Sequence, residues 1–228
     1  EIDELPGQIG KLTNLKMLEL FEVKLDGLPE EIGQLRQLKK LSLDTTGLAH
    51  FPKEVCLLQQ LESLKMADNS LTQLPKEISD LHVLKHLELG WNKLEKLHPA
   101  IGQLKHLTHL NLIKNLLTQL PSEIGALTDL SSLMLGHNQL THLPSEIGAL
   151  QNLRVLNADD NLLTELPASI GQLHLLYTLE LRNNQLQRLP ASIGQLTQLK
   201  TLSLQGNQLS ATEKTKITQW LPNCKIHF

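Results

Sequence analysis

Residues 130–140 read LSSLMLGHNQL, a pattern of the form LxxLxLxxNxL. The same spacing returns with its first position at residues 15, 38, 61, 84, 107, 130, 153, 176 and 199, so the period is 23 residues. A fixed period of this length along most of a chain is typical of a solenoid, in which each repeat contacts mainly its neighbours. The sequence therefore predicts a stack of nine similar units.

The spacing of the leucines predicts one strand in each unit. Leu133 and Leu135 are two residues apart, so they point to the same side of a strand, while Ser132 and Met134 point to the other. Parallel stacking of such strands, about 4.8 Å apart, would align the leucines in buried columns. The opposite side of the sheet is then a surface open to a partner.

An asparagine follows the strand in seven of the units, where the backbone leaves the sheet and loses its strand partners. A buried carboxamide both donates and accepts, so stacked asparagines can satisfy those backbone groups. Val23 and Thr46 stand at this position in the first two units, and we expect different local turns there. The seven asparagines are Asn69, Asn92, Asn115, Asn138, Asn161, Asn184 and Asn207.

The return half of each unit contains a Leu-Pro pair and predicts a short helical turn. Proline suits the first position of such a turn, and an acidic residue two positions later, such as Glu123, complements its positive end. The isoleucine that follows, such as Ile124, should point inward. Leu97-His98-Pro99 displaces the proline by one position, so we expect an altered turn there.

These motifs resemble the leucine-rich repeat family over essentially the whole chain, and the segment LPxxIGxL resembles the Ras-group, Roco and bacterial members. The resemblance implies a right-handed α/β solenoid with a concave parallel sheet, convex 3₁₀ or helical turns, and a binding function without catalysis. We interpret residues 1–228 as one domain, with a partial repeat (1–14), nine repeats (15–209) and a C-terminal cap (210–228). No polar cap precedes the first repeat, so we expect upstream residues or a partner at that end.

The C-terminal cap is predicted to contain a helix and a strand. Ser210 and Glu213 have the spacing of a capping box, in which each side chain bonds the other's free amide. A helix over residues 211–221 would follow, and Ile226 and Phe228 would point inward from a final short strand.

Composition limits the classes of partner and of chemistry. A net charge of −3 and a pI near 6.4 argue against nucleic-acid or membrane binding, and no apolar run is long enough to cross a bilayer. The two cysteines should be free thiols, which favours a cytoplasmic location, with a secreted bacterial protein as the alternative. No catalytic motif is present, so we expect neither an enzyme nor a cofactor. His86 and His109 should be neighbours, but two ligands do not make a metal site.

The concave face carries the candidate binding residues. Trp91, Ile113 and Met134 should lie on successive strands beside Val155, and grouped exposed apolar residues often mark an interaction site. Acidic residues outnumber bases on this face, which favours a partner with a basic patch. We expect a protein partner to contact His86, Glu88, Trp91, His109, Asn111, Ile113, Met134, His137, Asp159 and Asp160.

Two functions are consistent with these observations. The first is a protein-binding module, acting as a monomer, that presents a rigid curved sheet. The second is a regulatory domain of a larger signalling enzyme, such as a Roco GTPase, a kinase or a ubiquitin-ligase effector.

Overall fold

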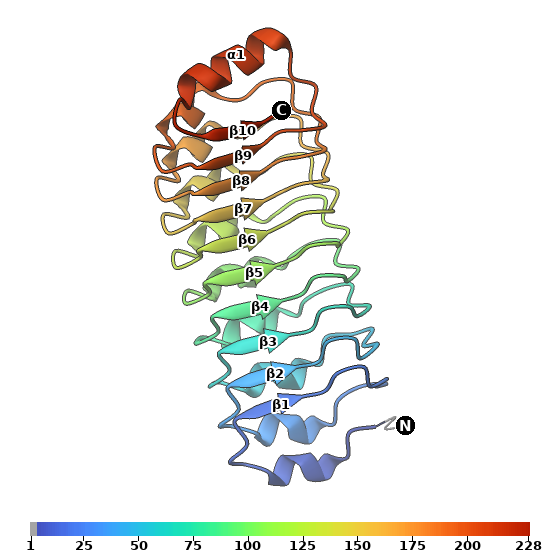
Figure 1. The fold of residues 1–228 in the computed structure, drawn as a ribbon. Coiled ribbons are helices and arrows are strands. Elements are labelled where there is room, and N and C mark those ends of the chain that lie inside the picture. The colour runs from blue at the N-terminus through green and yellow to red at the C-terminus, as the bar shows by residue number, and fades with distance from the viewer. Residues whose placement is uncertain (1–3) are drawn as a thin grey trace.

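A computed structural model describes residues 4–228, which form an elongated, gently twisted stack of repeats (Figure 1). One parallel sheet of ten strands runs along it, and each strand pairs with the next in sequence order. The strands are β1 (Met17–Glu19), β2 (Lys40–Ser42), β3 (Ser63–Lys65), β4 (His86–Glu88), β5 (His109–Asn111), β6 (Ser132–Met134), β7 (Val155–Asn157), β8 (Thr178–Glu180), β9 (Thr201–Ser203) and β10 (Lys225–His227).

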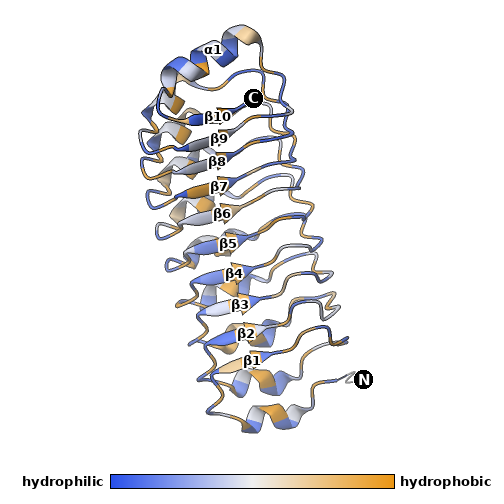
Figure 2. Ribbon diagram, in the orientation of Figure 1, coloured by the Kyte–Doolittle hydropathy of each residue, from blue (hydrophilic) through white to orange (hydrophobic). Residues whose placement is uncertain are grey.

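The strands pair in the register that the 23-residue period predicts. Leu110 of β5 lies opposite Leu133 of β6, which lies opposite Leu156 of β7, and all three are fully or almost fully buried. Leu87 and Leu89 are also buried, whereas Trp91 is exposed on the other side of the sheet. Hydrophobic and hydrophilic residues recur at equivalent places from repeat to repeat (Figure 2). The predicted separation into a leucine core and an open concave face is confirmed.

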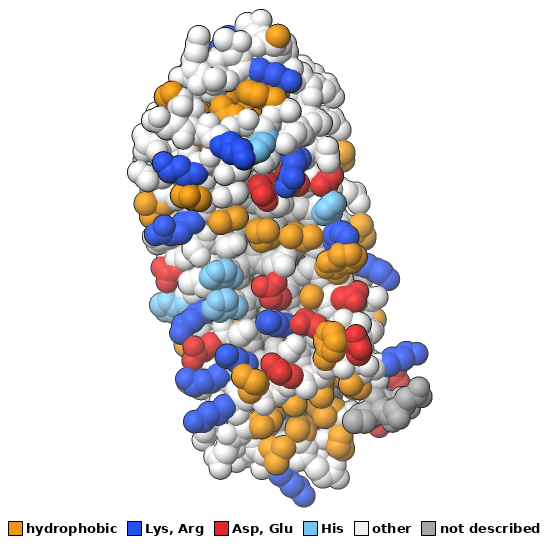
Figure 3. All heavy atoms as spheres, in the orientation of Figure 1, with side chains coloured by type: hydrophobic (Ala, Val, Ile, Leu, Met, Phe, Trp, Pro, Cys, Tyr) orange, Lys and Arg blue, Asp and Glu red, His pale blue; other side chains and the backbone are white. Residues whose placement is uncertain are grey.

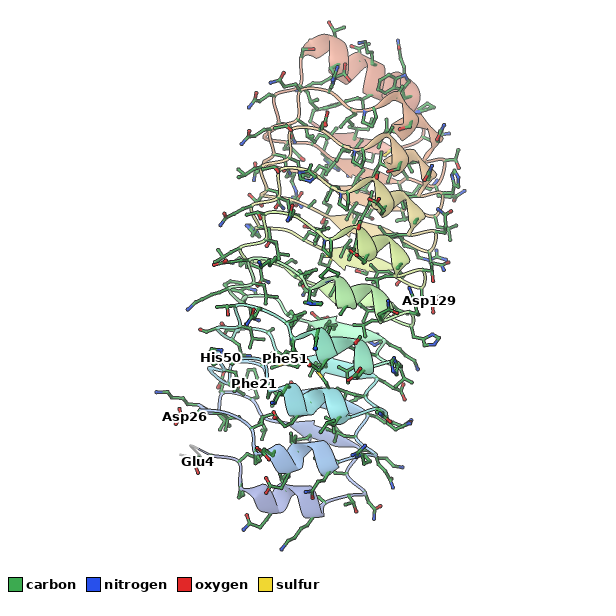
Figure 4. The ribbon with its side chains drawn as sticks, turned by 180° about the vertical axis from the view of Figure 1, so that it is seen from behind. Glu4, Phe21, Asp26, His50, Phe51 and Asp129 are labelled. Carbon is green, nitrogen blue, oxygen red and sulfur yellow. The ribbon has the colours of Figure 1, made fainter. Side chains whose placement is uncertain are left out.

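Short 3₁₀ helices line the convex side, as expected (Figure 4). In all but one of them the proline precedes the helix with an extended backbone, so it is the N-cap rather than the predicted first helical residue. Seven isoleucines in these helices, such as Ile124, are buried as predicted, whereas Ile9 in the first helix is half-buried and the third helix carries the buried Val55 instead. The helices are η1 (Gly7–Lys11), η2 (Glu30–Gln34), η3 (Lys53–Leu57), η4 (Lys76–Asp80), η5 (Pro99–Gln103), η6 (Ser122–Ala126), η7 (Ser145–Ala149), η8 (Ala168–Gln172) and η9 (Ala191–Gln195).

The turn at His98-Pro99 keeps the common geometry, so the expectation of an altered turn was wrong. His98 takes the N-cap position with φ −69° and ψ 138°, close to the −69° and 149° of Pro121. Any residue can adopt this extended conformation, and Pro99 fits the first helical position because no partner is needed for its nitrogen. The His98 Nδ1 also accepts a hydrogen bond from the Ala100 N–H at 3.1 Å.

The asparagine ladder forms as predicted. The Asn138 side-chain NH₂ donates to the carbonyls of Leu112 and Leu135, both at 2.9 Å, and its Oδ1 accepts from the Leu117 N–H at 3.0 Å. Thr46 replaces this arrangement in the second repeat, where its backbone carbonyl accepts the Leu25 N–H at 2.9 Å. The turn there differs locally, as expected from the missing asparagine.

The C-terminal cap departs from prediction in two details. Helix α1 (Ala211–Trp220) begins with the expected bond from the Glu213 N–H to Ser210 Oγ at 3.2 Å. The Glu213 carboxylate, however, reaches back to the Leu189 N–H at 3.2 Å, so the capping box is not reciprocal. Phe228 is 39% exposed rather than inward, because β10 and its ladder end at His227. None of the helices within residues 4–228 has the length and apolar character that a membrane crossing requires.

Candidate partner-binding surface

An apolar belt crosses the concave face diagonally. We define the apolar belt as Trp91, Ile113, Met134 and Val155, which follow β4, follow β5, end β6 and begin β7, respectively. Trp91 is 54% exposed, and the other three are half-buried. Hydrophobic side chains gather in a band across the middle of this face (Figure 3). The structure therefore brings together the apolar residues that sequence spacing predicted.

Trp91 has a backbone conformation that the leucine pattern did not predict. Its φ is +57°, in the left-handed region, and the equivalent residue has a positive φ in all of the other repeats. This conformation costs a non-glycine residue about 1–2 kcal/mol. It turns the chain off the sheet just before the asparagine and leaves the indole at the edge of the concave face. Gly206, which occupies this position in the last repeat, is the sequence signal that could have indicated it.

The indole of Trp91 already contacts a cation. The Lys114 ammonium, from the next repeat, lies 3.3 Å from the centre of the ring. An ammonium over an indole face is attracted by the negative face of the ring. Trp91 therefore offers both apolar surface and a face suited to a positive charge.

His86 and His109 stack on one another at the start of β4 and β5. Their ring centres are 4.7 Å apart and their planes differ by 14°. The nitrogen lone pairs of nearly parallel rings lie in nearly parallel planes, so in this stacked arrangement the two rings do not converge on one metal ion. Within residues 4–228, no group of three or more His, Cys, Asp or Glu side chains is placed to hold a metal.

The stack predicts a measurable shift in the titration of His86. Burial lowers its pKa below the ordinary 6.5, and the charge of His109 lowers it further, while Glu88 opposes the shift. We expect His109→Ser to raise the pKa of His86 toward 6.5, because the substitution uncovers the ring and removes a neighbouring charge. A titration followed by NMR checks this, with His142→Ser as a distant control. An unchanged pKa of His86 in His109→Ser would contradict the stacked arrangement.

Asp159 was predicted on the open face, but it is buried. Its two oxygens accept hydrogen bonds from the Arg182 backbone N–H at 2.6 Å and from Arg182 Nε at 2.9 Å. Burial raises the pKa of Asp159, and the bonds and charge of Arg182 oppose this. Glu180 lies on the other side of Arg182, with Oε1 at 3.7 Å from Nη2. Asp159 is therefore occupied within the protein and is removed from the candidate contact residues.

The remaining candidates divide into two groups. Glu88 and Asn111 are half-buried and lie in register with Met134 on adjacent strands, next to the belt. His137 and Asp160 lie beyond the strand ends, where His137 Nε2 is 3.6 Å from Asp160 Oδ2. The strands thus hold the first group beside the belt, and the second forms a separate pair at its C-terminal side.

Family comparison agrees with this architecture. The sequence model described as a leucine-rich repeat region matches residues 3–89 and 153–219, more than half of the chain. The chain belongs to the leucine-rich repeat family. No curated protein matches this leucine-rich repeat chain.

Solved structures of other leucine-rich repeat proteins resemble it closely. A TDR receptor is 30% identical with a TM-score of 0.88 and is aligned over 99% of this chain and 40% of its own. The plant peptide hormone receptor RGFR1, in complex with RGF2, is 26% identical with a TM-score of 0.79, over 98% and 41%. The Arabidopsis receptor kinase HAESA, in complex with the peptide hormone IDA and the co-receptor SERK1, is 30% identical with a TM-score of 0.80, over 91% and 36%. This leucine-rich repeat chain spans about two fifths of the length of these receptors.

The cysteines of this leucine-rich repeat chain are both free. Burial raises the pKa of the Cys56 thiol to about 12 and that of Cys224 to about 11. A thiol reacts as the thiolate, so these values indicate unreactive side chains near neutral pH.

Proposed function

We propose that this chain is a protein-interaction module that binds a segment of a protein or peptide partner on its concave face, acting as a monomer. The observation that carries the proposal is the apolar belt, in which a half-exposed tryptophan lies beside three other apolar side chains on the concave face. Tryptophan is among the residues that contribute most to binding at protein interfaces. Burying the belt under a partner would remove this apolar surface from water.

The rigidity of the sheet supports the proposal. The belt residues are attached to strands that pair with both neighbours and cover a continuous leucine core. A preformed surface loses little conformational entropy when a partner binds. Two of the similar structures, RGFR1 and HAESA, are described as complexes with peptide hormones, and they too are built from this fold.

The charges on the N-terminal half of the concave face favour a partner with a basic patch. Among residues 4–228, five carboxylates on the N-terminal half of this face form no ion pair within 4.0 Å. Unpaired carboxylates of this kind attract a basic partner and increase its rate of association at low salt. The five are Glu19, Glu22, Asp44, Asp68 and Glu88.

Replacing Trp91, Ile113 and Met134 together by Ser is expected to abolish partner binding without changing the fold. Peptides selected from a random library against the parent protein provide the probes, and their affinities for both proteins are measured by calorimetry. The loss of the aromatic anchor should weaken binding by about 2 kcal/mol or more. The control replaces Leu116, Leu162 and Leu175, which are exposed outside the belt, by Ser. Selected peptides that bind the belt variant as tightly as the parent would overturn the proposal.

A second candidate is a sensing segment within a larger signalling protein. It is favoured by the similar structure of HAESA, which is a receptor kinase of greater length than this chain. The parent reading frame distinguishes the two: a catalytic domain encoded in the same frame supports the second candidate, and a frame that encodes only repeats rejects it.

A further inference from the structure

The edge of the sheet where the strands begin has a charge opposite to that of the rest of the chain. We define the strand-start edge as the segments that run from the last residue of each 3₁₀ helix to the first residue of the next strand: 11–17, 34–40, 57–63, 80–86, 103–109, 126–132, 149–155, 172–178 and 195–201. These segments contain nine Lys or Arg and three Asp or Glu, a net charge of +6. The whole chain has a net charge of −3, so everything outside them carries −9.

The positive charge is concentrated in the first five segments. They contain seven of the nine bases and two of the three acids, together with His82, His86, His106 and His109. Figure 3 shows the result: blue side chains predominate along the left-hand edge of the lower half, with a few red ones among them, whereas most red side chains lie over the middle and right of the face. The total charge of the chain hides this separation.

Backbone hydrogen bonds hold the basic residues in a column. The Lys39 N–H donates to Lys16 O, the Glu62 N–H to Lys39 O, and the Lys85 N–H to Glu62 O, at 2.8, 2.8 and 2.9 Å. These residues therefore follow one another at the spacing of adjacent strands, about 4.8 Å. The column cannot disperse without breaking the sheet.

Glu62, which is itself in this column, forms ion pairs with two of its lysines. Its carboxylate oxygens lie 2.8 Å from Lys85 Nζ and 3.0 Å from Lys39 Nζ. The hydrogen bonds from Lys85 and Lys39 lower the pKa of Glu62 to about 2. This geometry shows that a carboxylate placed over the column is bonded by two ammonium groups. Lys16, Arg36, Lys40 and Lys105 form no ion pair within the described part of the chain.

We propose that the strand-start edge of the first five repeats binds an acidic segment of a protein partner, whose carboxylates pair with the free bases as Glu62 pairs with Lys39 and Lys85. This surface is distinct from the apolar belt, and its evidence is independent of the function proposed above. The attraction comes from complementary charge, so it fixes the orientation and speed of docking more than its final strength.

The width of the edge favours an extended polypeptide over a nucleic acid. A three-residue strand spans about 10 Å, close to the Debye length of about 8 Å at physiological salt. A wide duplex on this edge would bring its phosphates near the carboxylates at the strand ends. Proteins that bind single-stranded nucleic acid combine a basic groove with aromatic side chains on which the bases stack, and the first five segments contain no Phe, Tyr or Trp.

Binding of a synthetic oligoglutamate peptide to the whole chain tests the proposal, with calorimetry at low salt as the measurement. The test variant carries Lys16→Glu, Arg36→Glu and Lys40→Glu. The matched control carries Lys24→Glu, Lys93→Glu and Lys96→Glu, which are exposed residues outside the strand-start edge. Both variants have the same net charge, so a difference between them reports the position of the charges. Circular dichroism establishes that both are folded.

We expect the test variant to lose oligoglutamate binding by about tenfold or more, while the control loses much less. Glu62→Gln should strengthen binding, since it releases Lys39 and Lys85, and it does so without introducing any charge reversal. The Ser variant of the apolar belt should bind oligoglutamate as the parent does, which separates this proposal from the proposed function.

Three outcomes would overturn the inference. The first is an absence of oligoglutamate binding by the parent at low salt. The second is an equal loss in the test and control variants, which would indicate only the total charge. The third is binding of an oligothymidylate of the same charge as tightly as oligoglutamate, because the partner would then be a nucleic acid.

Discussion

Asn138→Leu is expected to lower the free energy of unfolding by about 1–3 kcal/mol, the cost of leaving one buried polar group, the Leu117 N–H, without a partner. The substitution removes the acceptor of the Leu117 N–H and the donor to the carbonyls of Leu112 and Leu135. Asn138 is only 8% exposed, so water cannot easily replace these bonds. A leucine of similar size would fit the space, and the carbonyls of Leu112 and Leu135 would keep their bonds from Asn115 and Asn161. The Leu117 N–H would have no acceptor.

Urea denaturation of Asn138→Leu and of the parent measures this effect. Gln139→Leu is the matched control, since it introduces the same side chain one residue later at an exposed position. Exposed substitutions usually change stability by less than about 0.5 kcal/mol. Equal midpoints for the two variants would show that the asparagine ladder does not hold the turns.

Gly125→Ala is expected to destabilise the protein by about 1–3 kcal/mol, the usual cost of overpacking. Successive 3₁₀ helices on the convex side approach so closely that a Cβ at Gly125 would lie 2.5 Å from Glu146 O and 2.8 Å from Glu146 Cβ. Both atoms belong to the next repeat, and one of them is backbone, so the two repeats would have to separate. Without this contact, alanine would stabilise by about 0.4–1 kcal/mol through the unfolded state.

Gly27→Ala is the control for this prediction. A Cβ at Gly27 would meet nothing within 4 Å, so this substitution should leave stability unchanged or raise it. Thermal unfolding of both variants gives the comparison. We expect Gly125→Ala to lower the unfolding temperature and Gly27→Ala to leave it unchanged or raise it. A higher unfolding temperature for Gly125→Ala would refute the close approach of the helices.

The fold was predictable because its determinants are local and repeated. The leucine spacing placed Leu87 and Leu89 in the core and Trp91 outside it, and the structure agrees. The asparagines predicted where the backbone would need side-chain partners. Repetition makes each signal appear many times in one sequence, so a single irregular unit such as the one at Thr46 is recognisable as a departure.

The wrong predictions concern polar side chains that have more than one hydrogen-bond partner within reach. Asp159 occupies an outward position, yet it is buried and forms an ion pair with the partly exposed Arg182 of the next repeat. Glu213 has the spacing of a capping box, but its carboxylate accepts a hydrogen bond from the Leu189 N–H of a different repeat instead. Periodicity specifies which strands are adjacent, but it does not specify which hydrogen-bond partners the long polar side chains take.

The candidate site was predictable only in part for the same reason. The belt residues followed from register, whereas the cation over Trp91 depends on the rotamer of Lys114 and on a left-handed backbone at +57°. The charge of the strand-start edge could have been counted from the sequence once the period was known. The net charge of −3 does not reveal this edge, because a total over the chain conceals charges that are segregated on its surface.

The bonds of the asparagine ladder all reach backward along the chain. In each of the seven, Oδ1 accepts the N–H of the residue 21 positions earlier, and the NH₂ donates to a carbonyl 26 positions earlier. The turn of each repeat is therefore fully hydrogen-bonded only when the next repeat is present. Ribosomes synthesise the N-terminal repeats first, so during translation each newly emerged repeat supplies the missing hydrogen bonds of the repeat before it. The last repeat to emerge from the ribosome still lacks these bonds.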